Sequence, residues 1–63
     1  MYHLEPTKPI KINDCKNLEV ALVVARVFSS AHRCSVTISN PECVPEFVAT
    51  FLDGKIINSC LYQ

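Results

Sequence analysis

The sequence predicts a small α/β fold, a two-layer sandwich with helices on one face of a three-stranded sheet and the order β-α-β-α-β. Residues 15–33 carry apolar side chains at helical spacing and contain neither glycine nor proline. The stretches on either side of them alternate apolar and polar residues, as half-buried strands do. With 63 residues, the chain has room for a single domain, residues 1–63.

The N-terminal residues predict an edge element followed by the first strand. Residues 1–8 are expected to form an arm or an edge strand, because Pro6 lacks the backbone donor of a central strand. The first regular strand is predicted at residues 9–14, "PIKIND", where isoleucines alternate with polar residues. Asp14 is then expected to cap the helix, since its carboxylate suits the free N–H groups of a first turn.

The helix is predicted over residues 15–33. Its apolar stripe contains Leu18, Ala21, Val24, Phe28 and Ala31, widened by Val20 and Val27, and the opposite side carries Glu19, Arg26, Ser29, Ser30 and Arg33. The apolar surface extends around more of the helix than a single core-facing side requires. We therefore expect the helix to form the centre of the core and to belong in part to an interface, so that the protein is a homodimer or larger.

Residues 34–40, "CSVTISN", give the most regular strand pattern in the chain. Cys34, Val36 and Ile38 are predicted to face the core, while the intervening residues carry hydroxyl groups on the other face. Asn40 and Pro41 favour a turn at the end of this strand.

Residues 44–53 are predicted to form the second helix, because their large apolar residues recur at helical spacing and Gly54 suits a C-terminal cap. The alternative is the order β-α-β-β-β, with a hairpin at Asp53-Gly54. It is less favoured because "FVATFL" does not alternate cleanly. In both cases residues 55–63 form the last strand, whose adjacent Ile56 and Ile57 give both faces apolar character.

Composition argues against an enzyme and against a bound cofactor. A single glycine nearly excludes the phosphate-binding loops of nucleotide enzymes, and the carboxylates show no paired spacing. The longest apolar run has six residues, whereas a membrane span needs about 20, so we expect a cytoplasmic protein. In that compartment the four cysteines, Cys15, Cys34, Cys43 and Cys60, are expected to be reduced thiols without metal.

The favoured function is that of a small non-enzymatic binding or regulatory module acting through protein–protein contacts. Such short chains are common in phages and mobile elements. If residues 44–53 are helical, Glu42, Glu46 and Asp53 form an acidic outer ridge, and these three are the candidate partner-binding residues. An acidic ridge suits a basic surface on a protein partner.

Two alternative functions use other residues. A nucleic-acid-binding accessory protein would use the basic N-terminal half, which contains Lys8, Lys11, Lys16, Arg26 and Arg33. The net charge of zero argues against it, because phosphate contacts supply most of the affinity of such proteins. The third candidate is a zinc-stabilised module, with His32, Cys34 and Cys43 as ligands, although the chain lacks the usual close cysteine pair.

Overall fold

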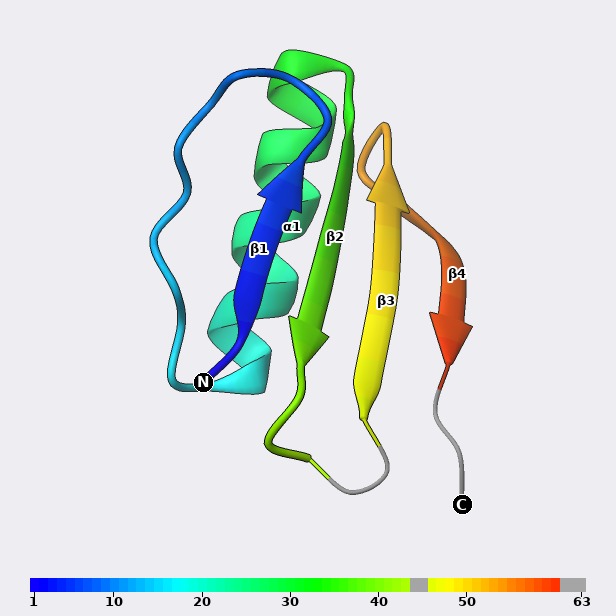
Figure 1. Ribbon diagram of the computed structural model, residues 1–63. Coiled ribbons are helices and arrows are strands. Elements are labelled where there is room, and N and C mark those ends of the chain that lie inside the picture. The colour runs from blue at the N-terminus through cyan, green and yellow to red at the C-terminus, as the bar shows by residue number, and fades with distance from the viewer. Residues whose placement is uncertain (44–45, 61–63) are drawn as a thin grey trace.

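The computed structural model describes residues 1–43 and 46–60. Along the chain the elements are β1 (His3–Pro6), α1 (Leu18–His32), β2 (Ser35–Asn40), β3 (Phe47–Leu52) and β4 (Lys55–Cys60). The four strands form one antiparallel sheet in the order β1-β2-β3-β4, and α1 packs on one face of it (Figure 1). The predicted small α/β class is confirmed, with one helix and four strands over the described residues in place of two helices and three strands.

The second predicted helix is wrong: β3 and β4 form a hairpin. Asp53 and Gly54 connect them with φ values of 54° and 79°. Two successive positive φ values are typical of the tight hairpin turn that Asp-Gly favours. Phe47, Ala49 and Phe51 are buried in the core, as alternation requires. The alternation was not visible in the sequence, because apolar residues also lie on the other face of β3. Val44 and Pro45, where the helix was expected to start, lie outside the described residues.

The predicted strand at residues 9–14 is also wrong, and β1 occupies the edge of the sheet instead. β1 pairs with β2, and Leu4 lies opposite Ile38. Ile10 and Ile12 pack against the core from the connection between β1 and α1, so their alternation reflects burial without a strand partner. Near the end of the connection, the backbone of Cys15 exchanges two hydrogen bonds with Tyr2, of 2.7 and 2.9 Å.

Asn17, and not Asp14, caps the start of α1. The Asn17 side chain accepts a 2.7 Å hydrogen bond from the N–H of Glu19. Asp14 lies three residues earlier and pairs with His3 at 3.1 Å between Oδ2 and Nδ1. The sequence offered two good capping residues close together, and the hydrogen bonds between Cys15 and Tyr2 hold the chain two residues before Asn17.

The core-facing side of α1 differs from the predicted stripe. Ala21, Ala25 and Ser29 are completely buried, although Ser29 was assigned to the polar side. Small side chains let the helix lie close to the sheet, whereas Val20 and Val27 of the predicted stripe are more than half exposed. Apolar residues surround much of α1, so periodicity alone did not select the buried face.

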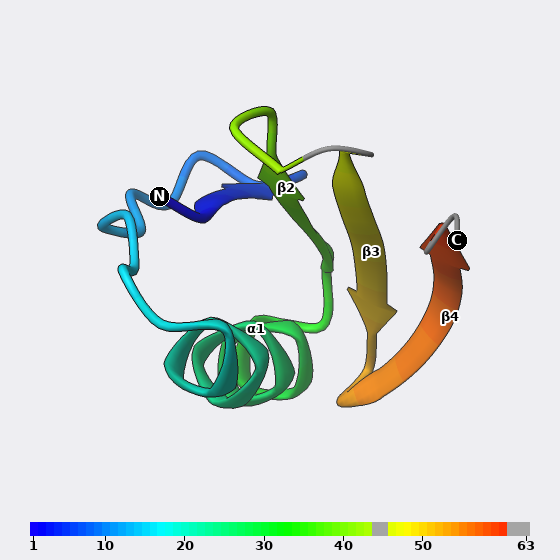
Figure 2. The same ribbon diagram turned by 90° about the horizontal axis from the view of Figure 1, so that it is seen from below.

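β2 follows its prediction. Val36 and Ile38 are completely buried and Cys34, just before the strand, is 4% exposed. On the opposite face, the hydroxyls of Thr37 and Thr50 lie 3.4 Å apart across β2 and β3. The sheet curves so that β4 forms its far edge, to one side of α1 (Figure 2).

Candidate protein-binding surfaces

The outer side of α1 carries an apolar surface that the core does not use. Val20, Val23 and Val27 are 51%, 60% and 56% exposed, and we call these three residues the valine face. Their spacing of three and four residues places them on one side of the helix, away from the buried Ala21 and Ala25. A solvated helix face normally carries polar residues, so an apolar one indicates a contact surface.

The valine face is bordered by charge and is slightly hollowed. Glu19, Val20, Val23 and Val24 line an open hollow of about 300 Å³. Arg26 and Val27 line a second hollow, of about 560 Å³, that extends to the hairpin turn at Gly54. Glu19 and Arg26 are both exposed, seven residues apart along the same helix.

The second apolar surface is the outer edge of β4, which we call the β4 edge and define by Ile56 and Ile57. Ile56 lies opposite the buried Phe51 and is 51% exposed. Ile57 is 57% exposed and falls at a register shift, because Phe51 pairs with Ile56 and Thr50 with Asn58. An extra residue of this kind is a β-bulge, which increases the local twist of the strand.

The two edges of the sheet are not equivalent. On the outer side of β1, the Tyr2–Cys15 bridge ties the connection to the start of the sheet. Among the described residues, no strand pairs with the outer side of β4. All the side chains of β4 whose burial is described, from Lys55 to Ser59, are exposed.

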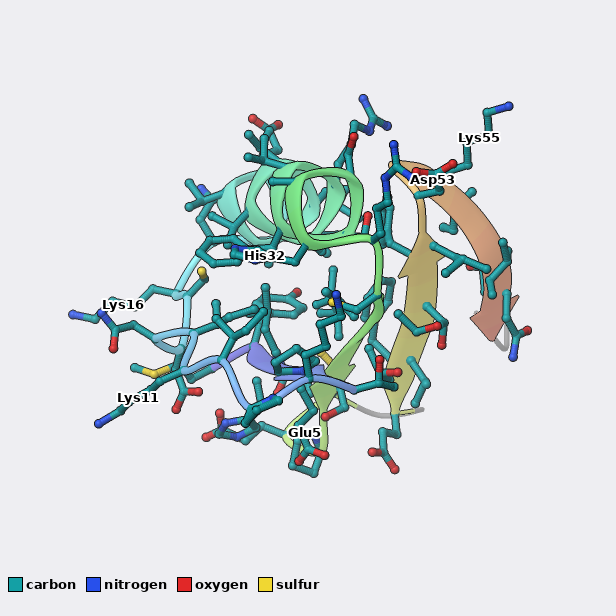
Figure 3. The ribbon with its side chains drawn as sticks, turned by 90° about the horizontal axis from the view of Figure 1, so that it is seen from above. Glu5, Lys11, Lys16, His32, Asp53 and Lys55 are labelled. Atoms are coloured by element: carbon teal, nitrogen blue, oxygen red, sulfur yellow. The ribbon has the colours of Figure 1, made fainter. Side chains whose placement is uncertain are left out.

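The structure separates the three acidic residues predicted to form a ridge. Glu42 lies in the turn after β2, where it contacts the amino group of Met1, and this contact holds the pKa of the Glu42 carboxyl below its usual value. Glu46 directly precedes β3, whereas Asp53 lies at the other end of β3, near Arg33 and beside Lys55 (Figure 3). No common helix face joins them. Their role in docking remains a prediction.

The residues proposed for zinc are not brought together. His32 ends α1 and its ring stacks on Phe28, with centroids 5.4 Å apart. Cys34 precedes β2 and Cys43 follows it, so the whole six-residue strand, about 20 Å long, separates them. Across residues 1–43 and 46–60 no group of three metal-ligating side chains forms. Cys15, Cys34 and Cys43 are free thiols, and the side chain of Cys60 lies outside the description.

The basic residues of the N-terminal half do not form one surface either. The amino group of Lys8 donates a 2.6 Å hydrogen bond to the carbonyl of His32, which neutralises the negative end of the α1 dipole. Lys11 and Lys16 project outward from the connection (Figure 3). Arg26 lies on the side of α1 that borders the hairpin turn. Two exposed lysines on one loop are fewer than the roughly six to ten phosphate contacts that make binding strongly dependent on salt.

Sequence reasoning missed both the valine face and the β4 edge as specific surfaces. The spacing of Val20, Val23 and Val27 was the available signal for the first, and the adjacent Ile56 and Ile57 for the second. In the part of the chain that the structure describes, the helix is too short to span a membrane. No protein-family model, curated protein or solved structure matches the chain.

Proposed function

We propose that the protein is a non-enzymatic binding module that acts through protein–protein contacts, with the β4 edge as the site that accepts an extended segment of a partner. The observation that carries this proposal is the difference between the two edges of the sheet. The outer side of β1 is tied to the connection at Tyr2, whereas β4 has exposed side chains and no described neighbour on its outer side.

An open strand edge provides two kinds of contact for an extended peptide. Its unpaired backbone groups supply hydrogen bonds, and side chains beside them supply specificity. Ile56 and Ile57 provide exposed apolar area along β4. The bulge at Ile57 and the charge of Lys55 are features that discourage uncontrolled pairing of edge strands, so the edge suits a specific partner better than open-ended stacking. The proposal includes the cytoplasmic setting that the sequence predicts.

The test compares two variants that carry the same new charge on different surfaces. Ile57→Lys alters the β4 edge, and Val23→Lys makes the matched change on the valine face, at a similarly exposed position. Each protein, immobilised, is used for affinity capture from the native host, and bound protein and nucleic acid are both quantified. We expect the wild type and Val23→Lys to retain the same protein partner in stoichiometric amount, and Ile57→Lys to lose at least nine-tenths of it.

Two results would overturn the proposal. One is retention of the same partner by Ile57→Lys, with the variant shown to be folded by its circular dichroism spectrum. The other is recovery of nucleic acid in place of protein, released by moderate salt and lost when Lys11 and Lys16 are replaced by alanine. That second result would instead support the nucleic-acid-binding function.

A further inference from the structure

We propose that the valine face of α1 is the contact between two copies of this chain, which pair their helices in antiparallel orientation about a twofold axis. This contact is independent of the β4 edge and of any partner bound there. The argument rests on the placement of the three valines, on the charges beside them and on the filled core behind them.

The first step is that the monomer gains little from these valines. The core side of α1 is complete, since Ala21, Ala25 and Ser29 are fully buried against the sheet. Valine is a poorer helix former than alanine or the long polar residues, because its branched side chain loses rotamers in a helix. Three valines on the outer side therefore weaken the isolated helix and leave apolar area in water.

The second step is the geometry of the stripe. Val20, Val23 and Val27 follow the three-then-four spacing of the seam between two packed helices, and the exposed Ala31, four residues after Val27, extends the apolar stripe. α1 has 15 residues and is therefore about 22 Å long, so the seam extends over most of its length. In an antiparallel pair with the axis beside Val23, Val20 of one copy meets Val27 of the other.

The third step is charge complementarity, which indicates that a second copy of this chain contacts the valine face and that the two helices are antiparallel. Glu19 and Arg26 are seven residues apart and flank the valine face on the same side, one residue before Val20 and Val27 respectively. In an antiparallel pair, such flanking positions of the two helices lie opposite each other. Glu19 of each copy then faces Arg26 of the other, which gives two reciprocal ion pairs.

A parallel arrangement does not produce this match. Glu19 would lie level with Glu19 of the second copy, and Arg26 level with Arg26. An unrelated partner helix does not produce the match either, since its charges have no reason to mirror those of this chain. A twofold contact is self-complementary by construction, since each surface meets its own copy. The pattern of Glu19, the valine face and Arg26 has this self-complementary property.

The size of the contact sets its strength. One helix face about 22 Å long covers much less than the roughly 800 Å² per partner of a standard stable interface. We therefore expect a weak dimer that dissociates at roughly 10–100 µM. Its formation depends on protein concentration and weakens as salt screens the ion pairs.

The experiment uses sedimentation velocity on the full chain from about 5 µM to 1 mM. The wild type is expected to approach twice the 7.1 kDa mass of one chain at the upper end. Val23→Lys is expected to remain at the single-chain mass throughout, and Ile57→Lys to dimerise like the wild type. Helical circular dichroism and a cooperative melt establish that each variant is folded.

A charge exchange tests the antiparallel direction. Glu19→Lys and Arg26→Glu each place like charges opposite one another, so each variant alone should dimerise at least tenfold more weakly than the wild type. An equimolar mixture of the two should regain wild-type affinity as a heterodimer, because each chain then opposes its charge complement. Lys16→Glu, the matched control, makes the same charge change as Arg26→Glu on the connection and should leave the dimer unchanged.

The inference is overturned if the wild type stays at the single-chain mass up to 1 mM. It is also overturned if dimerisation survives Val23→Lys and is lost in Ile57→Lys, which would assign the contact to the β4 edge. A dimer for which the mixture of Glu19→Lys and Arg26→Glu shows no recovery would contradict the antiparallel pairing. Because the mixing test does not use Val23→Lys, it decides the question even if that variant fails to fold.

Discussion

Ser29 connects α1 to the β3–β4 hairpin through a single buried hydroxyl. The Ser29 hydroxyl donates a 3.0 Å hydrogen bond to the carbonyl of Arg26 and accepts a 2.9 Å hydrogen bond from the N–H of Gly54. The side chain is completely buried. Gly54 approaches the helix closely here, since a Cβ atom at that position would lie 3.3 Å from the Cβ of Ser30. Replacing Ser29 therefore tests how the hairpin docks on the helix.

Ser29→Ala should destabilise the protein by about 1–2 kcal/mol. Loss of the hydroxyl leaves the N–H of Gly54 unpaired, which costs about 1–3 kcal/mol. Alanine is the better helix former, and this offsets about 0.5 kcal/mol. Domains of this size have a free energy of unfolding of roughly 3–9 kcal/mol. In so small a domain the change corresponds to a fall of about 4–16 °C in Tm.

The assay is urea and thermal denaturation followed by far-ultraviolet circular dichroism. Ser30→Ala is the matched control, because Ser30 is the exposed neighbour of Ser29, and it should lie within about 0.5 kcal/mol of the wild type. The amide of Gly54 should exchange with solvent faster in Ser29→Ala alone. Equal stability of the two variants, with unchanged exchange at Gly54, would refute the hydrogen-bonded docking of the hairpin.

Four further substitutions test the strands, the helix cap and the core. Thr50→Ala should lower the free energy of unfolding by up to about 1 kcal/mol in urea denaturation, because Thr50 is a β-branched residue of a central strand. Residues 46–52 should show the carbon chemical shifts of extended chain. A stabilised variant with helical shifts would contradict the assignment of β3. Asn17→Ala should lower the free energy of unfolding by about 1 kcal/mol, because it removes the helix cap. Asp14→Ala should lower it less, since Asp14 makes only an exposed pair with a histidine. If Asp14→Ala instead melted at the lower temperature, Asp14 would be the cap. Val36→Asp buries an unpaired charge and should abolish the cooperative melt, whereas a melt near that of the wild type would place Val36 in water.

β2 and most of α1 were predictable because local pattern and tertiary burial agree there. The inward Val36 and Ile38 alternate with hydroxyl-bearing residues, so period two was visible in the sequence, although the last inward residue, Asn40, is polar. α1 has 15 residues without glycine or proline, and no competing turn signal interrupts it. Only its ends and its rotation about the helix axis needed tertiary information.

The hairpin was not predictable from periodicity because both faces of β3 carry apolar residues. Phe47 and Phe51 face the core, while Val48 and Leu52 on the other face complete a pattern that fits a helix equally well. The turn chemistry of Asp53-Gly54 was the more reliable signal, since both residues adopt positive φ.

The candidate surfaces depended on the elements beneath them. The acidic ridge required a helix over residues 44–53, and without it Glu42 and Asp53 lie at different turns of the sheet. The valine face required knowledge of which side of α1 the sheet covers. The buried Ser29 and exposed Val23 reverse what hydropathy alone suggests. The β4 edge required the strand order, which no local pattern contains.

Amide hydrogen exchange, measured along the chain before and after addition of the captured partner, tests the binding function most directly. We predict that the partner slows exchange at Ile57, Asn58 and their neighbours in β4, with little change in the connection that carries Lys11 and Lys16. An extended segment paired with β4 gives new hydrogen bonds to its free backbone groups. Protection confined to the connection or to α1, with β4 exchanging as fast as in the free protein, would contradict the proposed role of the β4 edge.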